Sequence, residues 1–434
     1  MKSMTKVPGA LAPAARTPGW LPRAHPVSWQ MLGITTLAML MISVDRQLLP
    51  TVLPAIMQEF GLDAAQGGWL SSLSFVGTLI GALVVGVLAD SVGTGHRRAW
   101  SWVGACALTI GSAFATFYAR SLGALQVLRF TMGLGTGAME PVNIAVASEF
   151  WQKENRGFAL GVHHTGMPLG QFVGPVLMGL ILANGDWRAT FLWIPLIGLP
   201  IILLQLYLGR RRNEEQVYAW IREEGLTVPV DTAAPVSRNP LTNLRLAFAE
   251  RNVRLCLLMN FLFLWTEMGV ATFLTYQLTS QLGLSLAEAA VISGASGLVG
   301  WAGQIFWGTL SDHRGRKFAL GILTVGFSIC VALCMFIDSR TMAWTLLLAW
   351  GLFRNSPYVV LYSLAVDSSP RAAGSGLGLL IGVGLGLAGF LVGPVAGYVI
   401  EHFGWHWSYA MLALSCLLAL IPLRFVEETR HGAA

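Results

Sequence analysis

The stretch GTLSDHRGRK, residues 308–317, decides how this chain folds, because it joins two long apolar segments through a short polar turn. Its pattern is G-x-x-x-D-x-x-G-R-K. A looser copy, GVLADSVG at residues 86–93 followed by Arg97 and Arg98, stands 222 residues upstream. One such turn after an apolar helix is common. Two of them, at matching places in two apolar halves, indicate a duplicated unit.

The segments around these turns have the length and composition of membrane spans. The chain has 434 residues, of which 54% are hydrophobic and 12% are charged, against roughly 25% charged in a typical soluble domain. Twelve apolar runs follow one another between residues 30 and 426, and a helix of about 20 residues crosses the hydrocarbon core of a bilayer. Because lipid offers no partners to backbone polar groups, these runs are expected to be helices. The sequence predicts an all-α membrane protein with 12 transmembrane helices.

The positive charge of the chain is distributed unevenly across the predicted membrane. Of the 28 Lys and Arg residues, 22 fall in the tails and loops of one side, whereas the loops opposite hold only Arg120, Arg188 and Arg340. The positive-inside rule then predicts a protein of the cell membrane (plasma or inner membrane) with both termini on the cytoplasmic side. The net charge of +6 therefore reports topology and argues against a nucleic-acid partner. We expect the lipid bilayer as partner and a functional monomer.

A polar segment divides the apolar runs into six and six. The boundaries predict a disordered cytoplasmic tail at 1–28, a six-helix bundle at 29–209, a cytoplasmic linker loop at 210–252, a second six-helix bundle at 253–426 and a cytoplasmic tail at 427–434. The first 28 residues contain five prolines and no apolar core, so they do not resemble a signal peptide. Within the linker, residues 213–224 have the pattern of a short amphipathic helix on the membrane surface.

Landmarks recur between the two halves at a nearly constant offset. Asp90 corresponds to Asp312 at an offset of 222, Arg129 to Arg354 at 225, and GQFVGP at 170–175 to GFLVGP at 389–394 at 219. Such offsets indicate a parallel repeat, as in transporters whose halves move about a central site. Together with the loop pair, these landmarks resemble the major facilitator superfamily over essentially the whole chain. The resemblance implies two six-helix bundles with a central cavity lined by the first, fourth, seventh and tenth helices.

Six ionisable residues fall inside the apolar runs, all of them on helices that the resemblance places around the cavity. They are Asp45, Arg46, Arg129, Glu140, Glu267 and Arg354. A charge at the centre of a membrane costs roughly 3 kcal/mol or more, so each needs a partner or a purpose. Asp45 and Glu267 are 222 residues apart, so the repeat places one acid in each half. One interpretation is that the six form structural ion pairs.

The other interpretation is a proton-coupled site. If Asp45 or Glu267 takes a proton, an arginine loses its partner and can bind a substrate carboxylate through two hydrogen bonds. We therefore expect symport of a small organic anion, such as a monocarboxylate, hydroxycarboxylate or sugar acid. The energy source would be the proton gradient, with no cofactor and no metal.

The charged residues of the first and fourth apolar runs indicate which branch of the superfamily the chain resembles. The acid–arginine pair Asp45–Arg46, together with Arg129, resembles the pattern of the organic anion:cation symporter branch. Lysolipid carriers of the spinster type carry a similar acid–arginine pair. In the symporter branch an acid commonly follows the helix-4 arginine by seven residues, where this chain has Thr136. Glu140, one turn further on, is the candidate replacement.

Uncharged residues complete the predicted site. Gln171 and Gln304 are candidate hydrogen-bonding partners of the substrate, and Tyr358 shares a helix face with Arg354. Trp265 is either a cavity wall or a helix-packing residue. His163 and His164 are either a proton relay or polar packing residues.

The repeated turns also carry a predicted conformational latch. An acid ends the helix before each turn and bases follow it, and the resemblance implies that their contacts lock the outward-open state. The latch residues are Asp90, Arg97, Arg98, Asp312, Arg316 and Lys317.

A competing function rests on the fifth apolar run. Its glycines at 161, 170, 174 and 179, with Pro175, resemble the signature of drug:proton antiporters, although close helix packing explains the same pattern. Proton-driven export of drug-like or amphiphilic compounds is therefore the alternative. An enzyme is not expected, because the sequence contains no H-E-x-x-H, G-x-S-x-G or P-loop motif.

Overall fold

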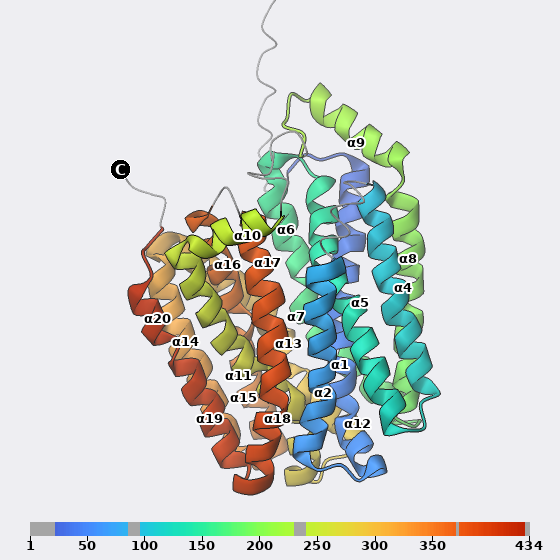
Figure 1. Ribbon diagram of the computed structural model, residues 1–434, viewed down its shortest axis with the longest axis vertical. Coiled ribbons are helices and arrows are strands. Elements are labelled where there is room, and N and C mark those ends of the chain that lie inside the picture. The colour runs from blue at the N-terminus through green and yellow to red at the C-terminus, as the bar shows by residue number, and fades with distance from the viewer. Residues whose placement is uncertain (1–21, 86–95, 230–239, 370–372, 430–434) are drawn as a thin grey trace, which may run out of the picture.

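The computed structural model describes residues 22–85, 96–229, 240–369 and 373–429, and these residues form helices joined by short turns, with no strand among them. Twelve helical rods cross the molecule, several of them built from two consecutive helices (Figure 1). Of the helical stretches within the described ranges, nine are long and apolar enough to span a membrane by length and composition. Most of the predicted N-terminal tail, part of the linker and the last five residues lie outside the described residues.

The first six rods come from the N-terminal half of the chain. They are α1 (Pro26–Phe60), α2 (Ala64–Ile80) with the π-helical η1 (Gly81–Val85), α4 (His96–Phe117), α5 (Leu122–Glu149), α6 (Arg156–His164) with α7 (Gly166–Leu182), and α8 (Arg188–Leu208). A 3₁₀ turn, η2 (Lys153–Asn155), precedes α6. The linker contributes α9 (Arg211–Glu223) and α10 (Pro240–Ala249).

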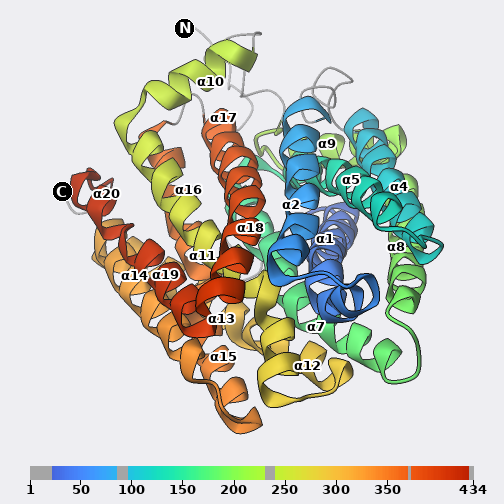
Figure 2. The same ribbon diagram turned by 60° about the horizontal axis from the view of Figure 1, so that its bottom comes forward.

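The other six rods come from the C-terminal half. They are α11 (Arg251–Leu282), α12 (Leu286–Ser293) with α13 (Ala295–Arg314), α14 (Arg316–Leu333) with η3 (Cys334–Phe336), α15 (Arg340–Arg354) with α16 (Ser356–Ser368), α17 (Ala373–Gly378) with η5 (Leu379–Leu385) and α18 (Gly386–Phe403), and α19 (Trp405–Leu417) with α20 (Leu420–Phe425). Figure 2 shows the two halves side by side, the first in blue and green, the second in yellow to red.

The repeat extends to the way in which the first helix of each half ends. Gly61 and Gly283, again 222 residues apart, end α1 and α11 in the left-handed conformation, with φ of 63° and 60°. This conformation costs glycine little, because glycine has no Cβ atom. Two residues later, Asp63 and Ser285 begin the next helix with a capping box each. Both halves therefore use the same turn to reverse the chain.

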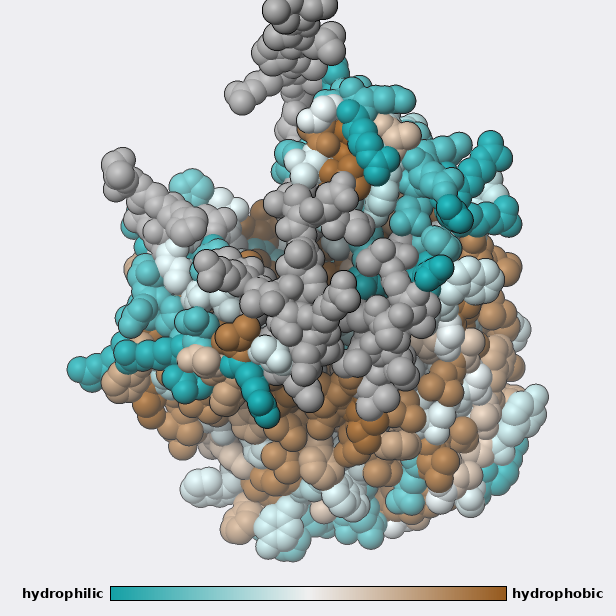
Figure 3. Space-filling view, turned by 45° about the horizontal axis from the view of Figure 1, so that its top comes forward, coloured by the Kyte–Doolittle hydropathy of each residue, from teal (hydrophilic) through white to brown (hydrophobic). Residues whose placement is uncertain are grey.

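The two faces of the molecule differ in polarity. Figure 1 shows α9, α10 and the C-terminal end at its top; we call this the terminal face, and the face with turns 61–63 and 283–285 the opposite face. Hydrophilic residues gather on the terminal face over α9 and beside α10, and a hydrophobic belt covers the visible side of the bundle below them (Figure 3). Leu203, Ile305 and Ile421 are more than half exposed in this belt, where lipid would cover them. The surface helix expected at 213–224 is α9, which buries Val217 and Ile221.

Contacts between the halves are concentrated in two helix pairs. α2 packs against α18, and α7 packs against α12 and α13. A Cβ atom on Gly68 would lie 2.1 Å from the carbonyl oxygen of Gly393, so these backbones touch directly. The glycines of α7 also serve packing, because the Cβ position of Gly170 is occupied by α1 and that of Gly179 by α12. The antiporter-like pattern therefore has a structural explanation in this chain.

Candidate substrate cavity

A cavity lies between the two halves, midway along their helices. It is lined by α1, α2, α5, α6 and α7 of the first half and by α11, α13, α15, α16 and η5 of the second. The empty space within it, together with its open mouth, is about 920 Å³. Seven of the residues predicted for substrate or proton binding line it: Arg46, Glu140, Gln171, Glu267, Gln304, Arg354 and Tyr358.

The first-half wall of the cavity carries one ion pair. Arg46 of α1 donates from Nη2 to Oε2 of Glu140 of α5 over 2.5 Å. The side chains are 19% and 9% exposed, so both reach the cavity. No other hydrogen bond within the described residues involves either side chain. The arginine therefore keeps most of its N–H donors available.

The second-half wall carries a pair with many more partners. Arg354 donates from Nε to Oε1 of Glu267 over 2.8 Å, and each side chain is only 3% exposed. Arg354 also donates to Ser296 Oγ at 2.8 Å, and Tyr358 donates to the second carboxylate oxygen of Glu267 at 2.5 Å. The Arg354 guanidinium lies 4.7 Å from the ring centroid of Trp350, a cation–π contact.

A pair of side-chain amides in the cavity wall joins the two halves. Asn355 Nδ2 donates to Gln171 Oε1 at 2.8 Å, and Gln171 Nε2 donates back to Asn355 Oδ1 at 3.2 Å. Gln304 donates to the backbone oxygen of Asn355 at 3.4 Å. Asn355 is not among the residues predicted from the sequence. The signal was the polar run at 354–356 followed by Pro357, which interrupts an apolar segment where α15 gives way to α16.

Asp45 and Arg129 lie in a smaller adjoining cavity that shares Arg46 and Phe75 with the main one. Arg129 is buried, donates from Nη2 to Thr116 Oγ1 at 2.8 Å, and lies 4.5 Å from the ring centroid of Phe191. Asp45 is also buried, and the charges of Arg129 and Arg46 both act on it. Among the described residues, neither Asp45 nor Arg129 forms a hydrogen-bonded ion pair. These two charges therefore interact through space across a pocket.

The predicted residue Trp265 lies in different surroundings. Trp265 packs on Phe261, with ring centroids 5.9 Å apart, in an apolar cluster with Leu264 and Leu385, outside the set of side chains that line the cavity. Tyr362 lines it. Phe75 and three methionines, Met39, Met167 and Met268, are among the apolar residues of the wall.

Comparison with known proteins identifies the family. The family model described as the Major Facilitator Superfamily matches residues 35–380 and, in a second match, residues 256–434. This chain belongs to the major facilitator superfamily. It is a multi-pass membrane transporter and not an enzyme, and its fold is the 12-helix fold of that superfamily.

Relatives with similar sequences are named as transporters, and the similarity covers most of this chain and most of each relative. The chain is 21% identical to the benzoate transport protein of Acinetobacter baylyi, over 93% of the chain and 91% of the relative. It is 25% identical to the 4-hydroxybenzoate transporter PcaK of Pseudomonas putida, covering 92% of each. It is 29% identical to the 3-(3-hydroxy-phenyl)propionate transporter of Escherichia coli, over 81% of the chain and 82% of the relative.

Solved structures share the fold of this superfamily member. A crystal structure of the D-xylose–proton symporter matches with a TM-score of 0.70 and 16% identity, over 94% of this chain and 99% of that one. An inward-facing bacterial homologue of the human lysosomal transporter Spinster matches with a TM-score of 0.67 and 18% identity, over 93% and 96%.

One basic residue of the predicted latch forms an ion pair within each half of the transporter. Arg98 contacts Glu149 at 2.5 Å in the first half, and Arg316 contacts Asp367 at 2.9 Å in the second. Arg97 is exposed. Asp90 lies outside the described residues, as does the side chain of Asp312 in α13.

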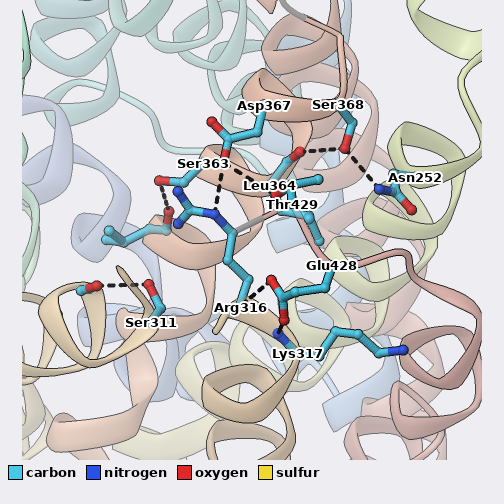
Figure 4. A network of polar contacts seen from close by, with 12 residues as sticks. Asn252, Ser311, Arg316, Lys317, Ser363, Leu364, Asp367, Ser368, Glu428 and Thr429 are labelled. Atoms are coloured by element: carbon cyan, nitrogen blue, oxygen red, sulfur yellow. Dashed lines mark hydrogen bonds and ion pairs between the residues drawn. The ribbon is translucent and has the colours of Figure 1, made fainter. Parts of the chain in front are cut away.

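The C-terminal segment is part of the second-half network (Figure 4). Glu428 accepts hydrogen bonds from the backbone N–H groups of Arg316 and Lys317, both at 3.0 Å, and thereby caps the start of α14. Thr429 donates to Asp367 at 3.3 Å. Glu428 is not among the residues predicted from the sequence, where its only signal is a pair of acids directly after the last apolar run.

Proposed function

We propose that this transporter is a proton-coupled symporter of a small aromatic carboxylate, working by alternating access. It would be driven by the proton gradient across a cell membrane, without a bound cofactor. One observation carries the proposal: Arg46, partly exposed to the central cavity, has a single carboxylate partner and free donors. One chain completes the cavity, which supports function as a monomer.

In this proposal, the substrate carboxylate replaces Glu140 as the partner of Arg46, and this replacement couples binding of the anion to binding of a proton. A substrate carboxylate can take two parallel N–H donors of the guanidinium and displace Glu140, because a bidentate contact is stronger than a single hydrogen bond. The displaced carboxylate, left in the low dielectric of the cavity, then favours its protonated form. One anion and one proton therefore bind together. Asp45, whose charge interacts with Arg46 and Arg129, is the second candidate for the proton.

The walls of the cavity support an aromatic substrate. Phe75, Tyr358 and Tyr362, with the methionines, line the space beside Arg46, and aromatic rings pack favourably against aromatic and thioether side chains. The relatives whose names give aromatic acids agree with this choice. Export of a cationic drug is less favoured, because Glu140 and Glu267, the acids lining the cavity in the described chain, are already paired with arginines.

The arrangement of the halves supports alternating access. We assign the terminal face to the cytoplasm from the distribution of Lys and Arg. The α2–α18 contact begins at the opposite face, where the backbone N–H of Ala64 donates to Glu401 at 3.4 Å. At the terminal face, the described ion pairs Arg98–Glu149 and Arg316–Asp367 each lie within one half. A rocking motion of the two halves would break the α2–α18 contact and leave the ion pairs within each half intact.

Uptake by purified transporter in proteoliposomes tests the proposal. We expect benzoate or 4-hydroxybenzoate to accumulate under an inward acid gradient, and an uncoupler to abolish this accumulation. Gluconate tests a sugar acid and tetraphenylphosphonium tests a cation in parallel. Accumulation of tetraphenylphosphonium under the opposite gradient, with no response to the acids, would contradict the proposal.

A further inference from the structure

His164 reaches the cavity but has no part in the exchange of partners at Arg46. It is the last residue of α6 and lines the cavity. It follows Arg156, the first residue of α6, by eight positions, or about 12 Å of helix rise. Glu140 precedes the last residue of α5 by nine positions, or about 14 Å. The imidazole and the carboxylate therefore lie at similar depths below the terminal face.

The hydrogen bond of His164 fixes which ring nitrogen carries hydrogen. Nδ1 lies 3.0 Å from the backbone oxygen of Leu160. A carbonyl oxygen only accepts, so Nδ1 must donate, and Nε2 of the neutral ring then bears the free lone pair. No described residue forms a hydrogen bond with Nε2. This nitrogen is available to take a proton from the cavity.

Of the two candidate proton acids on the elements around α6, Glu140 lines the same cavity as His164, whereas Asp45 lies in the adjoining one. α6 packs against α1, α5, α7 and η2. The 3₁₀ turn η2 contains Lys153 and Glu154, and Glu154 is exposed. α5 contributes Glu140, whose charge acts on His164, and α1 contributes Asp45 and Arg46; α7 contains no titratable residue. The neighbouring ring of His163, 5.4 Å away between centroids, is fully buried and has no hydrogen-bond partner in the described part of the chain.

We propose that His164 accepts at Nε2 the proton that Glu140 releases, and passes it to water on the terminal face. The role rests on the proposed symport. In this step the O–H bond of protonated Glu140 breaks and an N–H bond forms at Nε2, either directly or through one water. The carboxylate that results pairs with Arg46 again once the substrate has left. The imidazolium then loses the proton to water and returns to the neutral ring.

Two transport modes of the full-length protein separate this role from substrate binding. Net uptake of benzoate under an acid gradient requires proton release in every cycle, whereas exchange of external for internal benzoate does not. We expect His164→Gln to reduce net uptake about tenfold, as is typical for loss of a proton-transfer group, and to keep exchange within about twofold of wild type. His164→Asn serves as a second variant in case the first folds poorly.

His402→Gln is the matched control. His402 makes the same contact with the backbone oxygen four residues earlier, at 3.0 Å, but is exposed on the opposite face. We expect it to match wild type in both modes. Equal loss of exchange and net uptake in both His164 variants would overturn the proton role, and so would unchanged net uptake. If wild type itself accumulates no benzoate under the gradient, the proposed symport fails and this role with it.

Discussion

The two ion pairs that face each other across the cavity have the same chemistry and very different surroundings. Arg46 and Glu140 share one hydrogen bond and are partly exposed. Arg354 and Glu267 are almost completely buried and are held by Ser296, Tyr358 and Trp350 as well. A buried pair with satisfied partners is costly to disrupt, whereas a partly exposed pair with one contact can exchange it. Burial and the number of partners therefore separate a structural arginine from one that can bind substrate.

The largest expected effect comes from breaking the second-half pair. Arg354→Ala leaves Glu267 buried without its cation, so we expect a loss of about 3–5 kcal/mol in the free energy of unfolding. Thermal unfolding of the detergent-solubilised protein measures this. In the double variant Arg354→Met/Glu267→Gln, most of the stability should return. A single variant as stable as wild type would show that the pair is not structural.

Breaking the first-half pair should abolish transport with little loss of stability. For Arg46→Gln we expect benzoate uptake to fall about a hundredfold, because a bidentate contact to the carboxylate is lost. The free energy of unfolding should change by only about 1 kcal/mol, since the pair is partly exposed. Uptake and thermal unfolding are measured on the same preparation. If Arg46→Gln keeps full uptake, another arginine binds the substrate.

The two candidate proton acids can be separated by neutral variants. Glu140→Gln is expected to keep benzoate exchange but to lose about tenfold in gradient-driven uptake, because the side chain no longer takes a proton. Asp45→Asn is the parallel variant in the adjoining pocket. Uptake by both variants is measured with and without an acid gradient. If only Asp45→Asn uncouples uptake from the gradient, the proton binds in the smaller cavity.

The smallest expected effect concerns the amide pair between the halves. Gln171→Ala and Asn355→Ala should each slow uptake a few fold, and the double variant little more than either, because the two amides bond each other. A double-mutant cycle on benzoate binding should give a coupling of about 1 kcal/mol. Strictly additive losses would show that the two amides act independently.

The sequence was sufficient for the fold and for the arginines and glutamates of the cavity, because membrane spans and intramembrane charges are visible without knowledge of packing. The pairing of the charges was not visible. Arg46 meets Glu140 across 94 positions and Arg354 meets Glu267 across 87, and only the crossing of helices brings them together. Trp265 shows the same limit, since an aromatic residue on a cavity-lining helix can face a neighbour instead. Asn355 and Glu428 were missed because a single amide or acid at a helix end has many ordinary roles.

The glycine contact between α2 and α18 has a consequence for the variation that this transporter can tolerate. Gly68 and Gly393 touch backbone to backbone, and the Cβ position of Gly397 is occupied by Ala64. Even alanine at these positions would wedge the two halves apart at the opposite face. In a deep mutational scan selected for growth on a transported acid, these glycines should rank among the least tolerant sites, although none of them touches the cargo. Selection at these glycines would act on how long the two halves stay in contact at the opposite face.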